Sequence, residues 1–255
     1  MFKQLVFVSS IVGSLILTPL SAHAGIVTHY DIDFSSPTHN AGSSPSVGTA
    51  NNQVSRINFR NPTIGSTFAG LSNQSLHFDA ATSTYEQIQL NMGQGYNNYQ
   101  VSFDFYSSYL ANSLYHFNLS ADTPHVKNFY FHGNGRVQYW GGSDGVINGG
   151  MFTNNTIYNV LLDYDLADNE VDLWLNGVLL GTNAFNTSGD DIEAFRFGLS
   201  PWHGSAGLNP LVEVNLDNIL VTSRTPDVAN VPEPGPLLLM FLGLAGIASV
   251  RRLSS

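Results

Sequence analysis

The sequence predicts an all-β protein whose body is an antiparallel sandwich of two sheets. Short apolar runs with a two-residue period recur along most of the chain, and turns rich in Gly, Asn, Asp and Ser separate them. No segment of the body keeps an apolar period of about 3.6 residues over three turns, so we expect little helix there. Many evenly spaced short strands indicate two packed sheets rather than a single one.

The composition suits a body that is stabilised by an ordinary core. The chain has 255 residues, of which 43% are hydrophobic and 11% are charged, and it has no cysteine. The charged fraction is well below the usual value of about a quarter. Without cysteine the protein has neither disulfide bonds nor thiolate chemistry.

The net charge excludes nucleic acid as an expected partner. Residues 25–230 contain 6 basic and 18 acidic residues, and no basic cluster occurs that could pair with phosphates. An acidic body is compatible with divalent cations and neutral sugars. Solubility alone is the simpler explanation of the charge.

The N-terminus predicts a secretory signal peptide over residues 1–24. Lys3 precedes an apolar run that continues to Leu20 and would form the signal helix. Ala22 and Ala24 flank His23 in the small-x-small pattern of a cleavage site, so we expect cleavage after Ala24.

Residues 25–225 are expected to form one β-sandwich domain. Tyr30 to Phe34 alternate as a first strand, and residues 35–55 form a long Ser-, Gly- and Pro-rich loop. Further strands are expected around residues 57–59, 76–78, 101–105, 115–119, 129–131, 137–139, 158–164, 171–175, 178–180, 195–199 and 211–222.

Two turns and one irregularity within these strands can be predicted from individual residues. Gly133-Asn134-Gly135 and Asn176-Gly177 lie between apolar strands and supply residues that tolerate positive φ, which predicts tight hairpins. In the last strand Val212, Val214 and Leu216 occupy even positions, whereas the later apolar residues occupy odd ones. A strand exchanges its faces only through an inserted residue, so we expect a β-bulge near Asp217 and Asn218.

Two of these segments resemble a known fold family. The run Asp172-Leu-Trp-Leu-Asn-Gly-Val-Leu-Leu-Gly181 and the closing run Leu216-Asp-Asn-Ile-Leu-Val221 look like the hairpin and final strand of concanavalin A-like and laminin-G-like jelly rolls. The resemblance covers roughly residues 75–222 and implies a jelly-roll sandwich. An immunoglobulin-like sandwich is the main alternative, but the body is about twice as long as such a domain.

The C-terminus combines three features in order. Residues 226–236 form a linker that contains Pro232-Glu233-Pro234, and residues 237–255 begin with an uncharged apolar run from Leu237 to Val250. Arg251 and Arg252 follow and favour the cytoplasmic side. As a helix the run would be about 21 Å long, so it would be a short transmembrane helix in a bilayer core about 30 Å thick.

This tail resembles the PEP-CTERM sorting signal of Gram-negative bacteria, of which Pro232, Glu233, Pro234, Arg251 and Arg252 are the matching residues. The resemblance implies processing by an exosortase and transient contact with the inner membrane. The protein would be a membrane-anchored precursor that later reaches the cell surface or the extracellular matrix. A plain C-terminal anchor is the alternative.

The sequence offers no recognisable catalytic pair, so we expect a protein that is not an enzyme. Glycoside hydrolysis needs two carboxylates flanking the bond. Glu170 and Asp172 start such a pattern, but Trp174 and Leu175 stand where a further glutamate would be needed. A glycoside hydrolase or a polysaccharide lyase on the same fold remains the second hypothesis.

Sugar binding requires only an exposed aromatic ring with polar groups beside it. Two Gly-rich stretches fit, and they make Tyr139, Trp140, Trp202 and His203 the candidate carbohydrate-binding residues. Trp174 lies inside a tight hairpin and is expected in the core.

A structural Ca²⁺ is the one metal expected, because jelly rolls of the resembled type often hold one between the first and last strands. Asp33 and Asp217 are the carboxylates at those positions, and loop carbonyls would complete the six to eight oxygens that Ca²⁺ takes.

The sequence thus predicts an exported surface or biofilm matrix protein that binds extracellular polysaccharide. The alternatives are a carbohydrate-active enzyme and a structural protein without a ligand.

Overall fold

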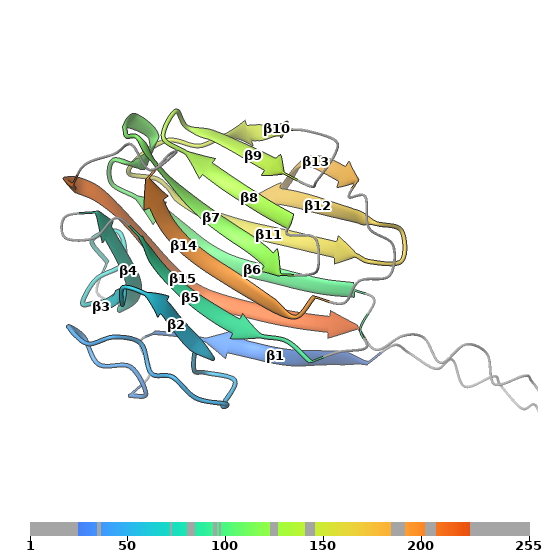
Figure 1. Cartoon of the computed structure of the whole chain (residues 1–255), viewed down its shortest axis with the longest axis horizontal. Helices are drawn as coiled ribbons and strands as arrows, with labels where there is room; N and C mark the ends of the chain where they lie inside the picture. The colour runs from blue at the N-terminus through green and yellow to red at the C-terminus, as the bar shows by residue number, and fades with distance from the viewer. Residues whose placement is uncertain are drawn as a thin grey trace, which may run out of the picture. The chain divides into compact units, whose positions relative to one another are not determined.

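The computed structural model describes residues 25–34, 37–71, 73–80, 85–93, 96, 98–122, 127–140, 146–184, 192–201 and 208–224. These residues form two antiparallel sheets that pack face to face, as Figure 1 shows, so the predicted all-β sandwich is confirmed. The expected signal helix and the expected C-terminal transmembrane helix lie outside the described residues. Within the described ranges no helix is long and apolar enough to cross a membrane.

The first sheet has eight strands in the order β13-β12-β11-β6-β15-β4-β3, with β1 also paired to β15. Its strands are β1 (Ile26–Ile32), β3 (Thr63–Gly65), β4 (Ser75–Ala80), β6 (Asn98–Ser107), β11 (Ile157–Asp165), β12 (Glu170–Leu175), β13 (Val178–Ala184) and β15 (Asn209–Arg224).

The second sheet has seven strands in the order β10-β9-β8-β7-β14-β5-β2. Its strands are β2 (Arg56–Phe59), β5 (Glu86–Asn91), β7 (Tyr115–Asp122), β8 (Lys127–His132), β9 (Arg136–Trp140), β10 (Val146–Met151) and β14 (Ala194–Pro201). A short 3₁₀ helix, η1 (Leu110–Asn112), joins β6 to β7 and is the only helix among the described residues.

The core between the sheets is aromatic. Phe105 of the first sheet is fully buried and stacks on Phe131 of the second, with ring centroids 4.5 Å apart. Phe103 meets Phe197 edge to face at 5.3 Å in the same layer. Such contacts follow from the two-residue period, because every second side chain of each sheet points to the other sheet.

The predicted hairpins are confirmed. Asn176 and Gly177 both have positive φ, 49° and 74°, as a two-residue turn that matches the strand twist requires. Gly135 closes the turn between β8 and β9 with φ of 80°. The expected strands did not include β3, β5 or β10, and β10 contains Gly149 and Gly150, which carry no apolar period.

The bulge in the last strand is also confirmed. The pairing of β15 with β6 shifts between Asp217 and Leu220, and Asn218 has φ of 52°. Val214 and Leu216 are buried before the bulge, and Ile219 and Val221 are buried after it. The inserted residue therefore lets a 16-residue strand bury apolar side chains in the core on both sides of the bulge.

Trp174 corrects the sequence-based expectation that it is a core residue. Its neighbours Leu173 and Leu175 are buried, whereas Trp174 itself is only half-buried and lies on the outer face of the first sheet. It is in register with Leu161 of β11 and Leu179 of β13, which form a small apolar row on that face.

Candidate functional site

The outer face of the second sheet carries a grid of polar side chains. Strand register places Asn58, Gln87, Gly198, Asn118, Tyr130 and Gln138 in one row across β2, β5, β14, β7, β8 and β9. A parallel row on the same face runs through Arg56, Gln89, Arg196, Ser120 and Asn128. Adjacent strands lie about 4.8 Å apart, so the hydrogen-bonding groups are closely spaced along each row. Gln87, Asn118 and Ser120 are buried, whereas Asn58, Gln89 and Gln138 are half-buried and keep some surface open.

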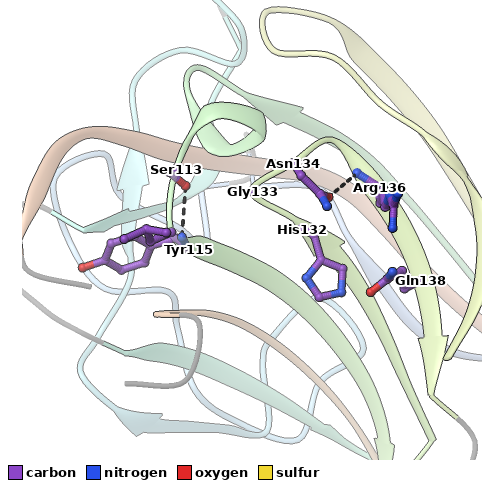
Figure 2. Close-up of a pocket in the computed structure, with 8 residues that line it drawn as sticks. Ser113, Tyr115, His132, Gly133, Asn134, Arg136 and Gln138 are labelled. Carbon is purple, nitrogen blue, oxygen red and sulfur yellow. Dashed lines mark hydrogen bonds between the residues drawn. The ribbon is translucent and has the colours of Figure 1, made fainter. Parts of the chain in front are cut away.

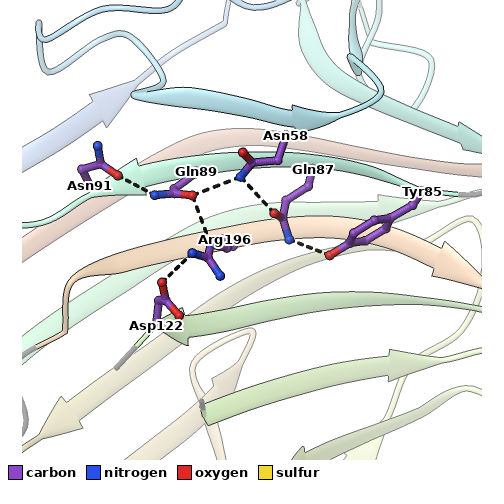
Figure 3. Close-up of polar contacts among 7 residues, drawn as sticks. All are labelled: Asn58, Tyr85, Gln87, Gln89, Asn91, Asp122 and Arg196. Atoms are coloured by element: carbon purple, nitrogen blue, oxygen red, sulfur yellow. Dashed lines mark hydrogen bonds and ion pairs between the residues drawn. The ribbon is translucent and has the colours of Figure 1, made fainter. Parts of the chain in front are cut away.

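Part of this grid is fixed by its own hydrogen bonds, which Figure 3 shows. The Nδ2 of Asn58 donates to the Oε1 atoms of Gln87 and Gln89, at 3.1 and 3.0 Å. The guanidinium of Arg196 donates to Gln89 at 3.1 Å and forms an ion pair of 2.5 Å with Asp122. These side chains are therefore held in defined orientations before any ligand arrives.

An aromatic pair stands at one end of the grid. Phe59 is 74% exposed, although it is a large apolar residue, and its ring centroid lies 4.4 Å from that of Tyr85. Phe59 has φ of 60°, which is a strained backbone conformation for a bulky residue. The side chain of Phe59 therefore does not follow the inward–outward alternation of β2 and is exposed. Gln87 donates to the Tyr85 hydroxyl at 2.6 Å. We call Phe59 and Tyr85 the aromatic platform.

The ring of Tyr85 can lie close to the grid because Gly198 has no side chain. A Cβ built on Gly198 would lie 3.2 Å from the Tyr85 ring and 3.2 Å from the Asn118 Oδ1. Even a methyl group at this position would require its neighbours to shift by a few tenths of an ångström, and a branched side chain would displace Tyr85 further. Asn118 Oδ1 is buried without a hydrogen-bond partner among the described residues.

A second aromatic group lies across β7 and β8. The ring centroid of Tyr130 is 5.1 Å from that of His116 and 5.5 Å from that of His132. His116 pairs through Nε2 with Ser200 Oγ at 2.8 Å. Burial, together with the charge of Arg136, lowers the pKa of His132 to about 4. Burial raises the pKa of Tyr130 and of Tyr85. His132 and both tyrosines therefore stay uncharged near neutral pH.

A pocket of about 360 Å³ opens at the end of the face beyond this aromatic group (Figure 2). It is lined by Ser113, Leu114, Tyr115, His132, Gly133, Asn134, Arg136 and Gln138. The segment before β7 approaches the hairpin closely, because a Cβ at Gly133 would lie only 1.9 Å from the Ser113 carbonyl oxygen. The pocket has the size of a small ligand site and contains no carboxylate among its lining residues.

The structure places the predicted sugar-binding residues differently from the expectation. Tyr139 is only 1% exposed and packs on Phe129 in the core, so the prediction that its ring is open to a sugar is wrong. The alternation that turns Val137 inward turns Tyr139 inward as well. Trp140 pairs through its backbone with Asn128 and Val146, and Trp202 and His203 lie outside the described residues.

The expected calcium ligands do come together. Asp217 at the bulge lies close enough to Asp33, just after β1, for that charge to contribute to the raised pKa of Asp217, whose main cause is burial. The carboxylate of Asp217 accepts hydrogen bonds from Asn73 Nδ2 at 2.6 Å, from Asn218 N at 2.9 Å and from the Phe34 backbone.

In the described residues N–H donors therefore meet the Asp217 carboxylate, whereas Ca²⁺ takes oxygen ligands. Among the described residues no group of three or more His, Cys, Asp or Glu side chains could hold a metal ion. This hydrogen-bonded corner ties the end of β1 and the start of β4 to the two halves of β15.

The comparison with family models identifies a motif at the C-terminus. Residues 230–252 match the PEP-CTERM protein-sorting motif. The chain carries a PEP-CTERM sorting motif. The motif implies an exported, sorted protein that is processed by an exosortase. Pro232, Glu233, Pro234, Arg251 and Arg252 fall within the match, while the structure of this segment lies outside the described residues.

Solved structures support the fold of the body. A structure named cellulose induced protein, Cip1, matches with a TM-score of 0.54 at 12% identity, over 75% of this chain and 95% of that one. A sialidase matches with a TM-score of 0.52 at 16% identity, over 77% of this chain but only 18% of the sialidase chain. At these identities the likeness establishes the jelly-roll sandwich alone. No curated protein matches the sequence.

Sequence reasoning missed the aromatic platform and the polar grid. The signal that could have found them is the run Glu-Gln-Ile-Gln-Leu-Asn at 86–91, where amides alternate with apolar residues. Such a strand covers a core with one face and offers amides on the other. Tyr85 directly precedes the run, but the outward turn of Phe59 depends on a backbone conformation that no local pattern predicts.

Proposed function

We propose that the exported body binds extracellular polysaccharide on the outer face of its second sheet, and that the protein serves as a surface or biofilm matrix component. The observation that carries the proposal is the aromatic platform of Phe59 and Tyr85 beside a row of amide side chains. The apolar face of a pyranose stacks on an open aromatic ring, while amides bind its hydroxyl groups.

The preorganised grid supports the same proposal. Asn58 and Gln89 are half-buried and are already held in place by their hydrogen bonds, so little side-chain entropy is lost when a sugar replaces the water beside them. An exposed, strained phenylalanine costs folding free energy and gains nothing from burial. Such strain is typical of residues that are retained for a ligand.

We further propose that the face binds without catalysing a reaction. Among its described positions the one outward carboxylate is Asp122, and Arg196 neutralises it. His132, with a pKa of about 4, and Tyr130, with a raised pKa, are poor proton-transfer groups near neutral pH, where an effective acid or base has a matched pKa. A glycoside hydrolase would need a second carboxylate on this face.

The test uses the exported product purified from a host that secretes it. Retention on the host's own exopolysaccharide is measured together with the release of reducing or unsaturated ends. Phe59→Ala should abolish retention and leave the melting temperature unchanged, because the ring is exposed. Leu179→Ala, at a 43% exposed apolar position on the first sheet, is the matched control and should retain binding.

Each result has a clear meaning. Retention without new ends supports a binding protein, and release of ends would establish the carbohydrate-active enzyme instead. No retention of the wild-type protein would leave the structural protein without a ligand as the remaining hypothesis.

A further inference from the structure

The charges of the sandwich are sorted between its two sheets. The strands of the first sheet contain nine acidic residues and a single arginine, Arg224. The strands of the second sheet contain four basic residues, Arg56, Lys127, Arg136 and Arg196, and two acidic ones. The chain as a whole carries a net charge of −10, yet most of the few basic residues in the strands lie in one sheet.

The acidic residues of the second sheet do not offset the arginines that alternation places on its outer face, Arg56, Arg136 and Arg196. Glu86 is only 2% exposed and lies on the inner side of β5, where it accepts a hydrogen bond from the backbone of Asp79. Asp122 is engaged by Arg196. The unpaired charges on the outer face of the second sheet are therefore positive, whereas the charged residues of the first sheet are nearly all acidic.

Two of the arginines are open to a ligand and stand at opposite ends of the face. Arg56 on β2 and Arg136 on β9 are both exposed, and neither forms an ion pair within the described part of the chain. Five strand-to-strand steps separate β2 from β9, which corresponds to about 24 Å. A single monosaccharide cannot contact both, but a polymer lying across the strands can.

The pocket at the Arg136 end is built for an anionic group. Arg136, Gln138 and Asn134 supply N–H donors to its lining, and its lining residues include no carboxylate that would repel an anion. Figure 2 shows these side chains on the strands and the turn of the β8–β9 hairpin. A guanidinium matches the planar carboxylate of an acidic sugar by two parallel hydrogen bonds.

From this charge sorting and this pocket we propose that the polysaccharide is acidic, with one carboxylate seated on Arg136 in the pocket and others meeting Arg56 at the far edge. The inference rests on the proposed function and specifies its substrate class as a polymer containing uronic acids. The acidic first sheet repels the same polymer and thereby fixes which face is used. Duplex nucleic acid is disfavoured, because two open arginines set among amides cannot neutralise its dense phosphates.

The test is affinity electrophoresis of the exported protein in native gels that contain a defined polymer. The polymers are alginate, polygalacturonate, the carboxyl-reduced form of each, and neutral dextran, with duplex DNA as a further probe. We expect retardation by at least one uronate polymer and its loss with the carboxyl-reduced form. Retardation should also weaken as the ionic strength rises, because salt screens the exposed arginines.

The variants Arg136→Gln and Arg56→Gln should each weaken retardation about tenfold, as expected for one charge-assisted pair. Arg224→Gln makes the same charge change on the first sheet, at another exposed arginine, and should change retardation less than about twofold. Arg136→Lys keeps the charge and should restore part of the binding. Melting temperatures of all variants establish that each is folded.

The outcomes separate this inference from the proposed function. Equal retardation by a uronate polymer and its carboxyl-reduced form overturns charge selection and leaves polysaccharide binding intact. Retardation by dextran alone does the same. No retardation by any polysaccharide overturns both proposals, and retardation by DNA alone overturns polysaccharide as the occupant of the face. An equal effect of Arg224→Gln and Arg136→Gln overturns the assignment of the pocket.

Discussion

Glu86 offers the sharpest test of the energetics behind this face, because it is a carboxyl group buried at the base of the strand that carries Gln87 and Gln89. Burial is the main cause that raises its pKa from 4.5 to about 7, and the charge of Asp79 adds to the increase. The Asp79 backbone N–H and the charge of Arg60 oppose it. The native protein therefore holds a proton on Glu86 that the unfolded chain releases above pH 4.5.

The sign of the pH dependence follows from this difference. The stability associated with the neutral carboxyl group is fully present below pH 4.5 and is lost as the pH rises through about 7. Glu86→Gln replaces the neutral acid by a neutral amide of the same shape and keeps an acceptor oxygen for the Asp79 N–H. The pKa difference corresponds to about 3 kcal/mol, since each unit is about 1.4 kcal/mol.

We therefore expect Glu86→Gln to match the wild-type protein at pH 4 and to be more stable by about 3 kcal/mol at pH 8.5. Urea unfolding at pH 4, 5.5, 7 and 8.5 measures the free energy of unfolding of both proteins. Near pH 8.5 the difference should appear as a rise in melting temperature of about 6–12 °C for a domain of this size.

Glu170→Gln is the matched control, because Glu170 is exposed at the start of β12. It should change stability by less than about 0.5 kcal/mol at every pH. A difference between Glu86→Gln and wild type that is constant from pH 4 to pH 8.5 would refute the reasoning, since it would show that Glu86 has the same pKa in both states.

Further predictions concern the core, the face, the β15 corner and the tail. Phe105→Ala should lower the free energy of unfolding by about 3–5 kcal/mol in urea titrations, because the fully buried ring stacks on Phe131. Gly198→Val should abolish polysaccharide retention in the binding assay, since its side chain would displace Tyr85; unchanged retention would contradict the role of the platform. Calorimetric scans with Ca²⁺ and with EDTA should give the same melting temperature, because N–H donors surround the Asp217 carboxylate; a clear rise with Ca²⁺ would restore the calcium site. Intact-mass measurement of the mature protein from a host with an exosortase should show a C-terminus near residues 232–234, and an intact residue 255 would argue against processing.

Most strand positions could be predicted from the sequence because their signals are local. The Asn176-Gly177 turn needs two residues that accept positive φ, and the bulge at Asp217 follows from a change of parity in the apolar positions. The sorting motif is equally local, since a receptor reads it as a linear segment and the family model recognises it in the same residues.

The candidate site could not be predicted in the same way. Alternation shows that Tyr139 and Trp174 each point to the opposite face of the sheet from the residues beside them in the strand. It does not show which of the two faces meets the core. In the structure Tyr139 is buried and Trp174 lies on the outer face, the reverse of what loop and hairpin context suggested.

By itself the sequence determined an exported, sorted chain with a β-sandwich body, because export signals, turns and strand periods are properties of neighbouring residues. Only the tertiary structure decided where a ligand would lie. The order β9-β8-β7-β14-β5-β2 brings Arg136, Tyr130, Gly198, Gln87 and Arg56 onto one face although 142 positions separate Arg56 from Gly198. The physical reason is that non-local strand pairing sets the register between distant segments, and that register assembles both the polar grid and the charge sorting of the two sheets.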